Sequence, residues 1–166
     1  SLGVSVATIK RWISILEASY IIYLLPAHHN NRGKRIIKSP KIYFYDTGLV
    51  AHLTRVTSTE LFEHGPMTGA LFENYIVMDT LKRLKHSDQK AELSFYRTSH
   101  GIEVDLIIDY FTHKEWIEIK SGYTFKPKMT KAIEQVLSES DKGKLIYRGE
   151  TTAYANNIEI LNIHDF

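Results

Sequence analysis

The stretch ELSFYRTSHGIEVDLIIDYFTHKEWIEIKSG, residues 92–122, decides the fold of this 166-residue chain. Three runs rich in Ile, Val, Tyr, Phe and Trp are separated by the breaks Ser-His-Gly and Phe-Thr-His-Lys. This pattern predicts three short strands joined by tight turns. Alternation predicts one apolar face on the middle strand, formed by Ile102, Val104, Leu106 and Ile108.

Three charged residues interrupt these apolar strands. Asp105 lies in the middle run, and Glu118 and Lys120 share a face of the last run because side chains repeat every two residues. Carboxylates in such places are unfavourable unless something pairs with them, and two on neighbouring strands repel each other. A divalent cation relieves that repulsion, and hard oxygen ligands suit Mg²⁺ or Mn²⁺. The set predicts a metal site in which Asp105 and Glu118 bind the ion and Lys120 stabilises charge on a phosphate.

Several motifs in order along the chain resemble a known family. Ile-Glu-Val-Asp followed by Ile-Glu-Ile-Lys resembles the core of the PD-(D/E)XK, or restriction-endonuclease-like, nuclease fold. With Gly-Ala-Leu-Phe-Glu-Asn-Tyr from residue 69, Tyr-Arg at 96 and Glu-Ile-Lys-Ser-Gly from 118, nearly the whole chain resembles the C-terminal region of prokaryotic AAA-superfamily ATPases. The resemblance implies an α/β fold with an αβββαβ core. The sequence departs from the nuclease motif at Val104, which stands where a proline leads the aspartate.

A long helix is expected before the strands, at about Thr68 to His86, with Thr68 as its N-cap. Glu73 in its first turns has two readings. It complements the helix dipole without any further role, or, as the resemblance implies, it adds a helical carboxylate to the catalytic metal site. After the strands we expect a helix at Lys126 to Ser140 and two strands near residues 144–148 and 158–163, which matches the order of the αβββαβ core.

The first third of the chain predicts part of a winged helix-turn-helix. A helix that begins after Ser5 should bury the stripe Ile9, Trp12, Ile13 and Leu16. A strand, a polar basic turn and a returning strand follow, so the first helices of the motif are missing. Two readings stay open: DNA contact by a basic set, or a packing module between domains with a solvated face. The basic set is Lys10, Arg11, Arg32, Lys34 and Arg35.

Charge and break signals divide the chain at Gly65-Pro66. Residues 1–65 hold eight Lys or Arg and four Asp or Glu, a net charge of +4, whereas residues 66–166 hold thirteen and fifteen, a net charge of −2. We therefore expect a partial winged-helix segment at 1–65 and a nuclease-like domain at 66–166. The basic first segment is the part suited to a polyanion such as DNA.

Composition excludes several classes of protein. No apolar run approaches the about 20 residues that cross a bilayer, and no signal-peptide pattern is present. The absence of cysteine excludes disulfides and thiolate metal sites and fits the cytoplasm. The chain carries no G-x-x-x-x-G-K-[ST] phosphate loop, so the resemblance assigns any ATP binding to a domain N-terminal to it. Since the sequence does not begin with Met, we expect a fragment whose partners include that ATPase domain.

Three functions fit these features. The first is a Mg²⁺- or Mn²⁺-dependent nuclease that hydrolyses DNA. The second is a nuclease-like module that binds DNA or a partner and does no chemistry. The third is a scaffold for the ATPase domain, in which Lys120 simply pairs with Glu118 or Asp105.

Overall fold

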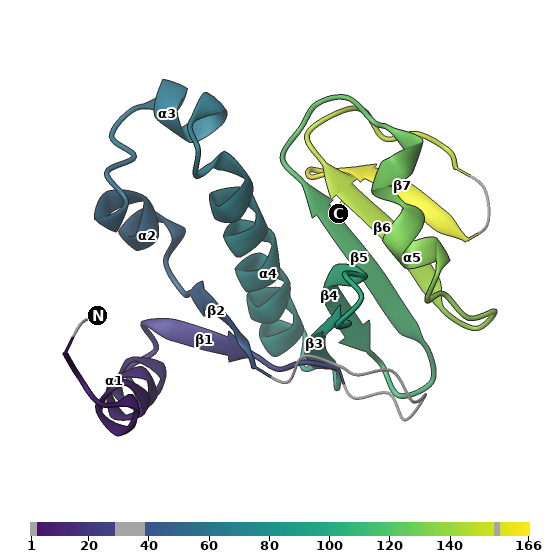
Figure 1. Cartoon of the computed structure of the whole chain (residues 1–166). Helices are drawn as coiled ribbons and strands as arrows, with labels where there is room; N and C mark the ends of the chain where they lie inside the picture. The colour runs from purple at the N-terminus through teal and green to yellow at the C-terminus, as the bar shows by residue number, and fades with distance from the viewer. Residues whose placement is uncertain (1–2, 29–38, 155–156) are drawn as a thin grey trace.

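The computed structural model describes residues 3–28, 39–154 and 157–166 of the chain. It has the expected α/β class, with a two-stranded and a five-stranded sheet (Figure 1). In chain order the helices and strands are α1 (Val6–Ala18), β1 (Ile22–Leu25), β2 (Lys41–Phe44), α2 (Thr47–Leu53), α3 (Thr59–His64), α4 (Thr68–His86), β3 (Glu92–Arg97), β4 (Glu103–Asp109), β5 (Lys114–Lys120), a 3₁₀ turn (Pro127–Met129), α5 (Lys131–Glu134), β6 (Lys142–Tyr147) and β7 (Ile158–Asn162).

The five-stranded sheet has the order β3-β4-β5-β6-β7. The three strands predicted in residues 92–122 are confirmed, and they form an antiparallel meander. β6 and β7 add to it in parallel, with α5 in the connection from β5 to β6. α4 lies against one face of the sheet and α5 against the other (Figure 1).

The hairpin of β1 and β2 is part of the main core. Leu25, Ala27 and Tyr43 are buried in the same apolar cluster as α4 and one face of the sheet. After β1 the chain runs beside β3, where the N–H of Phe95 donates to the carbonyl of Pro26 at 3.0 Å. The first segment and the sheet are therefore joined by buried apolar contacts and by backbone hydrogen bonds.

A β-bulge in β4 changes which side chains share a face. The register between β3 and β4 shifts by one residue across Phe95, which stands opposite both Asp105 and Leu106. As a result Leu106 packs in the cluster with α4, whereas Ile102 and Val104 pack on the opposite face. The expectation of one apolar face along the strand was wrong, because the extra residue reverses the alternation.

Helix prediction succeeded for α4 and failed for the segment after the meander. α4 spans residues 68–86 as expected, but Met67 is its N-cap and the hydroxyl of Thr68 donates to the carbonyls of Phe62 and Gly65. The helix expected over residues 126–140 is reduced to a 3₁₀ turn and the single turn of α5. No helix in the described ranges is both long and apolar enough to cross a membrane.

α1 begins after Ser5, whose side chain accepts a hydrogen bond from the Thr8 N–H, as the sequence predicted. Its apolar stripe does not face a core, since none of its residues is buried and the Trp12 side chain is half exposed. Only β1 makes extensive contact with α1 in the described part of the chain. The predicted burial was wrong because the pattern shows which face is apolar, not what covers it.

Candidate functional site

Asp105 occupies the point where backbone pairing between β4 and β5 stops. The paired register ends at Leu106 and Ile117. One residue further, Asp105 Oδ2 accepts a hydrogen bond of 3.0 Å from the backbone N–H of Ile119. The buried carboxylate thus takes the place of a carbonyl in the ladder and fixes β5 next to the bulge.

Glu118 and Lys120 follow on β5 and complete a compact charged set with Asp105. Lys120 Nζ lies 2.5 Å from Glu118 Oε1 and 3.6 Å from Asp105 Oδ2. Glu118 Oε2 is buried and has no hydrogen-bond partner among the residues that the structure describes. Burial, and then the neighbouring Asp105 charge, raise the pKa of Glu118 to about 7. A buried acceptor without a donor is unfavourable, and a bound cation would relieve it.

Glu73 joins this set through residues of β2. Tyr43 Oη donates to Glu73 Oε1 at 2.6 Å, and Lys41 Nζ donates to the same oxygen at 3.1 Å. Lys41 Nζ also lies 3.5 Å from Asp105 Oδ1. Burial and the Glu73 carboxylate raise the pKa of Tyr43 well above its usual range, so the phenol stays a donor. The structure therefore brings together all four predicted site residues, with Lys41 linking the helical carboxylate to the strands.

Lys41 is the main residue of the site that the sequence did not reveal. Its Nζ lies 2.8 Å from Glu103 Oε1, and Arg97 Nε lies 3.2 Å from the other oxygen of Glu103. Burial alone would lower the pKa of Lys41, but Glu73 and the neighbouring carboxylates raise it above its ordinary value. Alternation does place Lys41 and Tyr43 on one face of their strand, but it does not indicate that this face meets α4.

The donor set fits a hard divalent cation through two carboxylates. No three His, Cys, Asp or Glu side chains in the described residues have the spacing of a metal cage. Mg²⁺ commonly binds through one or two carboxylates and keeps waters or phosphates as its other ligands. Asp105 and the unpartnered Oε2 of Glu118 would supply those two ligands. Glu73 is engaged with Tyr43 and Lys41 instead.

The predicted DNA-binding residues do not form part of this set. Lys10 and Arg11 are exposed on α1, and the hairpin of β1 and β2 lies between α1 and the five-stranded sheet (Figure 1). Arg32, Lys34 and Arg35 fall outside the described residues. DNA contact by these five residues stays a prediction.

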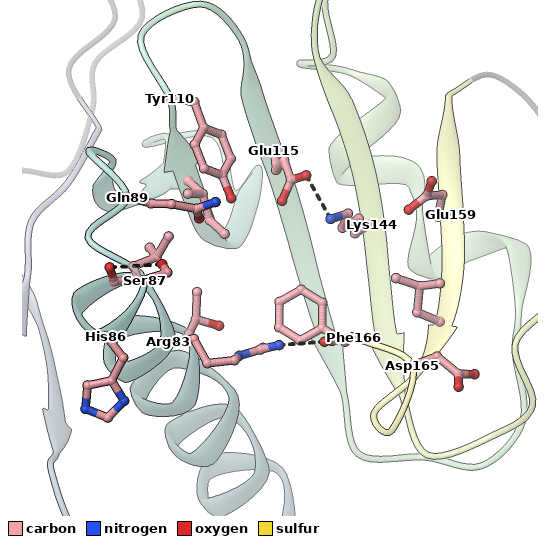
Figure 2. Close-up of a pocket in the computed structure, with 14 residues that line it drawn as sticks. Arg83, His86, Ser87, Gln89, Tyr110, Glu115, Lys144, Glu159, Asp165 and Phe166 are labelled. Atoms are coloured by element: carbon pink, nitrogen blue, oxygen red, sulfur yellow. Dashed lines mark hydrogen bonds and ion pairs between the residues drawn. The ribbon is translucent and has the colours of Figure 1, made fainter.

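Two cavities differ in their relation to the charged set. One of about 260 Å³ opens between β2 and the first turns of α4, with Lys41 and Glu73 in its wall. Another of about 740 Å³ lies by the C-terminal half of α4 and β6 (Figure 2), and Asp105 is not among the residues that line it. Its Lys144 is paired with Glu115 at 2.8 Å, and its Arg83 donates to the carbonyl of Phe166 at 2.6 Å. The smaller cavity therefore adjoins the candidate site through Lys41 and Glu73, although Asp105, Glu118 and Lys120 do not line it.

Comparison with known proteins places most of the chain within one family model. Residues 68–166 match the model described as Domain of unknown function (DUF4143), and residues 1–60 match Domain of unknown function (DUF8612). Similar proteins include "Uncharacterized protein Rv2008c" of Mycobacterium tuberculosis and "Uncharacterized protein Mb2031c" of Mycobacterium bovis, each 29% identical over 152 residues. The match covers 90% of this chain and 33% of each relative, so the chain spans about a third of their length. No solved structure matches the chain.

Proposed function

The chain belongs to the family described as Domain of unknown function (DUF4143), and from this premise and the geometry of its charged set we propose that it is a divalent-metal-dependent nuclease domain acting on DNA. The restriction-endonuclease-like resemblance of its motifs supports this proposal. DNA is proposed as the substrate because of the same resemblance and because the first segment, residues 1–65, is basic.

The observation that carries the proposal is the buried, unpartnered Oε2 of Glu118. It lies in a set where Asp105 already accepts the Ile119 N–H and Lys120 already pairs with Asp105 and with the other oxygen of Glu118. A protein that used Glu118 only as an ion-pair partner of Lys120 would have no need to bury its second oxygen without a donor. An ion held by Asp105 and Glu118 accounts for that oxygen.

Each residue then has a role in phosphodiester hydrolysis. A bound Mg²⁺ or Mn²⁺ supplies Lewis acidity and lowers the pKa of a bound water. Asp105 is held in one orientation by the Ile119 N–H. Lys120 places a positive charge beside both carboxylates, where it stabilises negative charge that develops on a phosphate oxygen. Glu73 positions Lys41 from the helix side.

We propose that this domain works in the cytoplasm within a longer protein whose ATP-binding domain lies N-terminal to it. The resemblance of the motifs to the C-terminal region of AAA-superfamily ATPases supports this arrangement. The mycobacterial relatives are about three times as long as the matched region, which leaves room in them for such a domain.

The test is cleavage of single-stranded and duplex DNA in the presence of Mn²⁺. Asp105→Asn keeps the size of the side chain and a carbonyl oxygen for the Ile119 N–H, but removes the charge. We expect at least about a 100-fold loss of cleavage rate, the scale of losing one key electrostatic group. Asp109→Asn is the matched control, because Asp109 ends the same strand and pairs with Lys114 at 3.1 Å. Equal cleavage by Asp105→Asn, or none by the unaltered chain, refutes the proposal.

A second candidate is a nuclease-like module that binds DNA or the ATPase domain without chemistry. The observation that favours it is the pairing of the carboxylates with Lys41 and Lys120 inside the chain. This candidate predicts DNA retention in EDTA that is lost when Arg32, Lys34 and Arg35 are replaced by Gln. Retention that survives those replacements counts against it.

A further inference from the structure

We propose that Lys41 is a resident cation of the charged site, and that a divalent cation binds there in competition with its ammonium group. This inference rests on the proposed function, because it concerns the same carboxylates. It adds a residue from the first segment of the chain that controls how tightly the ion binds.

The position of Lys41 is that of a bound cation. Its Nζ lies 2.8 Å from Glu103 Oε1, 3.1 Å from Glu73 Oε1 and 3.5 Å from Asp105 Oδ1. These three carboxylates come from β4 and α4, and the lysine comes from β2. The side chain is four-fifths buried, so water screens these contacts only in part. An ammonium group here does what an ion would do, since it neutralises carboxylates that face one another.

The balance of charge explains why the two cations compete. Four carboxylates meet in the set, and three cationic groups face them: Lys41, Arg97 and Lys120. When Glu118 is ionised, the excess is one negative charge, and one oxygen of Glu118 has no partner among the described residues. A divalent ion held by Asp105 would overfill the set and repel the ammonium group, which lies 3.5 Å from Asp105 Oδ1. The repulsion is relieved when Lys41 withdraws from Asp105.

A cavity beside Lys41 could receive its ammonium group after it leaves Asp105. The cavity of about 260 Å³ between β2 and α4 has Lys41 in its wall together with Glu73. Lysine keeps its charge on a flexible stem with three rotatable donors. The flexible stem would let the ammonium group turn toward this cavity, where Glu73 also lines the wall.

The competition couples the metal site to the hairpin of β1 and β2. The proposed ligands Asp105 and Glu118 belong to the sheet, whereas Lys41 arrives on a strand of the first segment. Coupling between two binding events is reciprocal. A partner that pulls the hairpin away from α4 will tighten metal binding, and metal binding will loosen the contact of Lys41 with β4.

The experiment is calorimetric titration of Mn²⁺ into the full chain and into Lys41→Met, Lys41→Arg and Lys114→Met. We expect Lys41→Met to bind Mn²⁺ at least about tenfold more tightly than the unaltered chain, because one repelling charge is gone. Lys41→Arg keeps the charge and should bind as weakly as the unaltered chain. Lys114→Met removes a lysine that pairs with Asp109 at the far end of β4, and should change nothing.

Thermal unfolding is a second measurement, and it distinguishes weak Mn²⁺ binding from loss of folding in Lys41→Met. Mn²⁺ should raise the midpoint of its thermal unfolding by more than it raises that of the unaltered chain, and Asp105→Asn in the same background should abolish the gain. If Lys41→Met binds Mn²⁺ no more tightly than the unaltered chain, the competition is refuted. The outcome is independent of cleavage, so a chain that never cuts DNA refutes the nuclease and leaves the competition standing.

Discussion

Asp141 shows how a single buried acid can join two strands. Its Oδ1 accepts the N–H of Lys114 at 2.9 Å, and its Oδ2 accepts Trp116 Nε1 at 3.1 Å and Ser138 Oγ at 2.6 Å. Burial by itself would raise the pKa of this carboxyl, but the three hydrogen bonds lower it below its usual value. The carboxylate therefore ties the start of β5 to the turn before β6.

A depressed pKa in the folded state means that the ionised form stabilises the fold. That stability is present above the unfolded pKa of about 4 and is lost as the pH falls through the lower folded value. We predict that Asp141→Asn lowers the free energy of unfolding by about 1–3 kcal/mol at pH 7, since an amide nitrogen would face donors. Urea unfolding at pH 7 and pH 3 checks this, and the deficit should shrink at pH 3.

Asp79→Asn serves as the control for that comparison. Asp79 is only partly buried, with 41% of its side chain exposed, and pairs with Arg83 one turn along α4, so its loss should change stability by less than about 0.5 kcal/mol. A deficit of Asp141→Asn that is the same at both values of pH would contradict the assignment to the charged carboxylate.

At the scale of single residues, the sequence predicted Asp105, Glu118 and Lys120 because strand alternation acts within a few residues. It did not predict Lys41, Tyr43 or Glu103 as parts of the site. Lys41 and Glu73 are 32 positions apart, and their contact depends on how β2 packs against α4. No local pattern contains that information.

At the scale of elements, one amide side chain of α4 binds the backbone of β2, in addition to the contacts of Tyr43 and Lys41 with Glu73. The Phe44 N–H donates to Asn74 Oδ1 at 2.7 Å, and Asn74 Nδ2 donates to the Phe44 carbonyl at 3.0 Å. The side chain of Asn74 thus completes the free edge of a two-stranded sheet as a further strand would. It also holds Lys41 and Tyr43 against Glu73, because they lie on the same short strand.

We predict that Asn74→Ala lowers the free energy of unfolding by about 2–4 kcal/mol, since two backbone groups of Phe44 lose their partner. Denaturant unfolding measures this change. Thr80→Val is the matched control on α4, because its hydroxyl bonds only the Ile76 carbonyl of its own helix. Equal effects of the two substitutions would show that the amide is not what fixes β2.

Element prediction succeeded where the pattern is long and failed where an irregularity intervenes. α4 carries enough helical periods to be recognised at both ends. The bulge at Asp105 consists of one extra residue, and the alternation on either side of it looks regular in the sequence. α5 ends at Glu134, and further along Ser138 donates to Asp141, a contact that a helix running to residue 140 would not leave free to form.

At the scale of the whole molecule, the division expected at residues 65 and 66 crosses one continuous core. Leu25 is fully buried in the cluster formed by α4 and the sheet. We predict that Leu25→Ala destabilises the sheet itself by about 2–5 kcal/mol, as for other buried leucines. The test uses a Trp12→Phe background, in which Trp116 of β5 is the remaining tryptophan and reports on the sheet.

The denaturant midpoint of Trp116 fluorescence should fall together with the midpoint from circular dichroism. Leu53→Ala is the control in the same segment, because Leu53 is largely exposed on α2. A Trp116 transition that does not move in Leu25→Ala would mean that the first segment unfolds separately from the sheet.

The hydrogen bond from the Ile119 N–H to Asp105 affects how strongly evolution should preserve this aspartate. Asp105 completes the backbone ladder of the sheet, so natural selection for folding alone would preserve it in a lineage that had abandoned catalysis. Glu118 accepts no backbone hydrogen bond of this kind: among the described residues Oε1 pairs with Lys120, and Oε2 has no partner. If the proposed metal site is real, relatives that have lost it should therefore keep the aspartate and lose the glutamate.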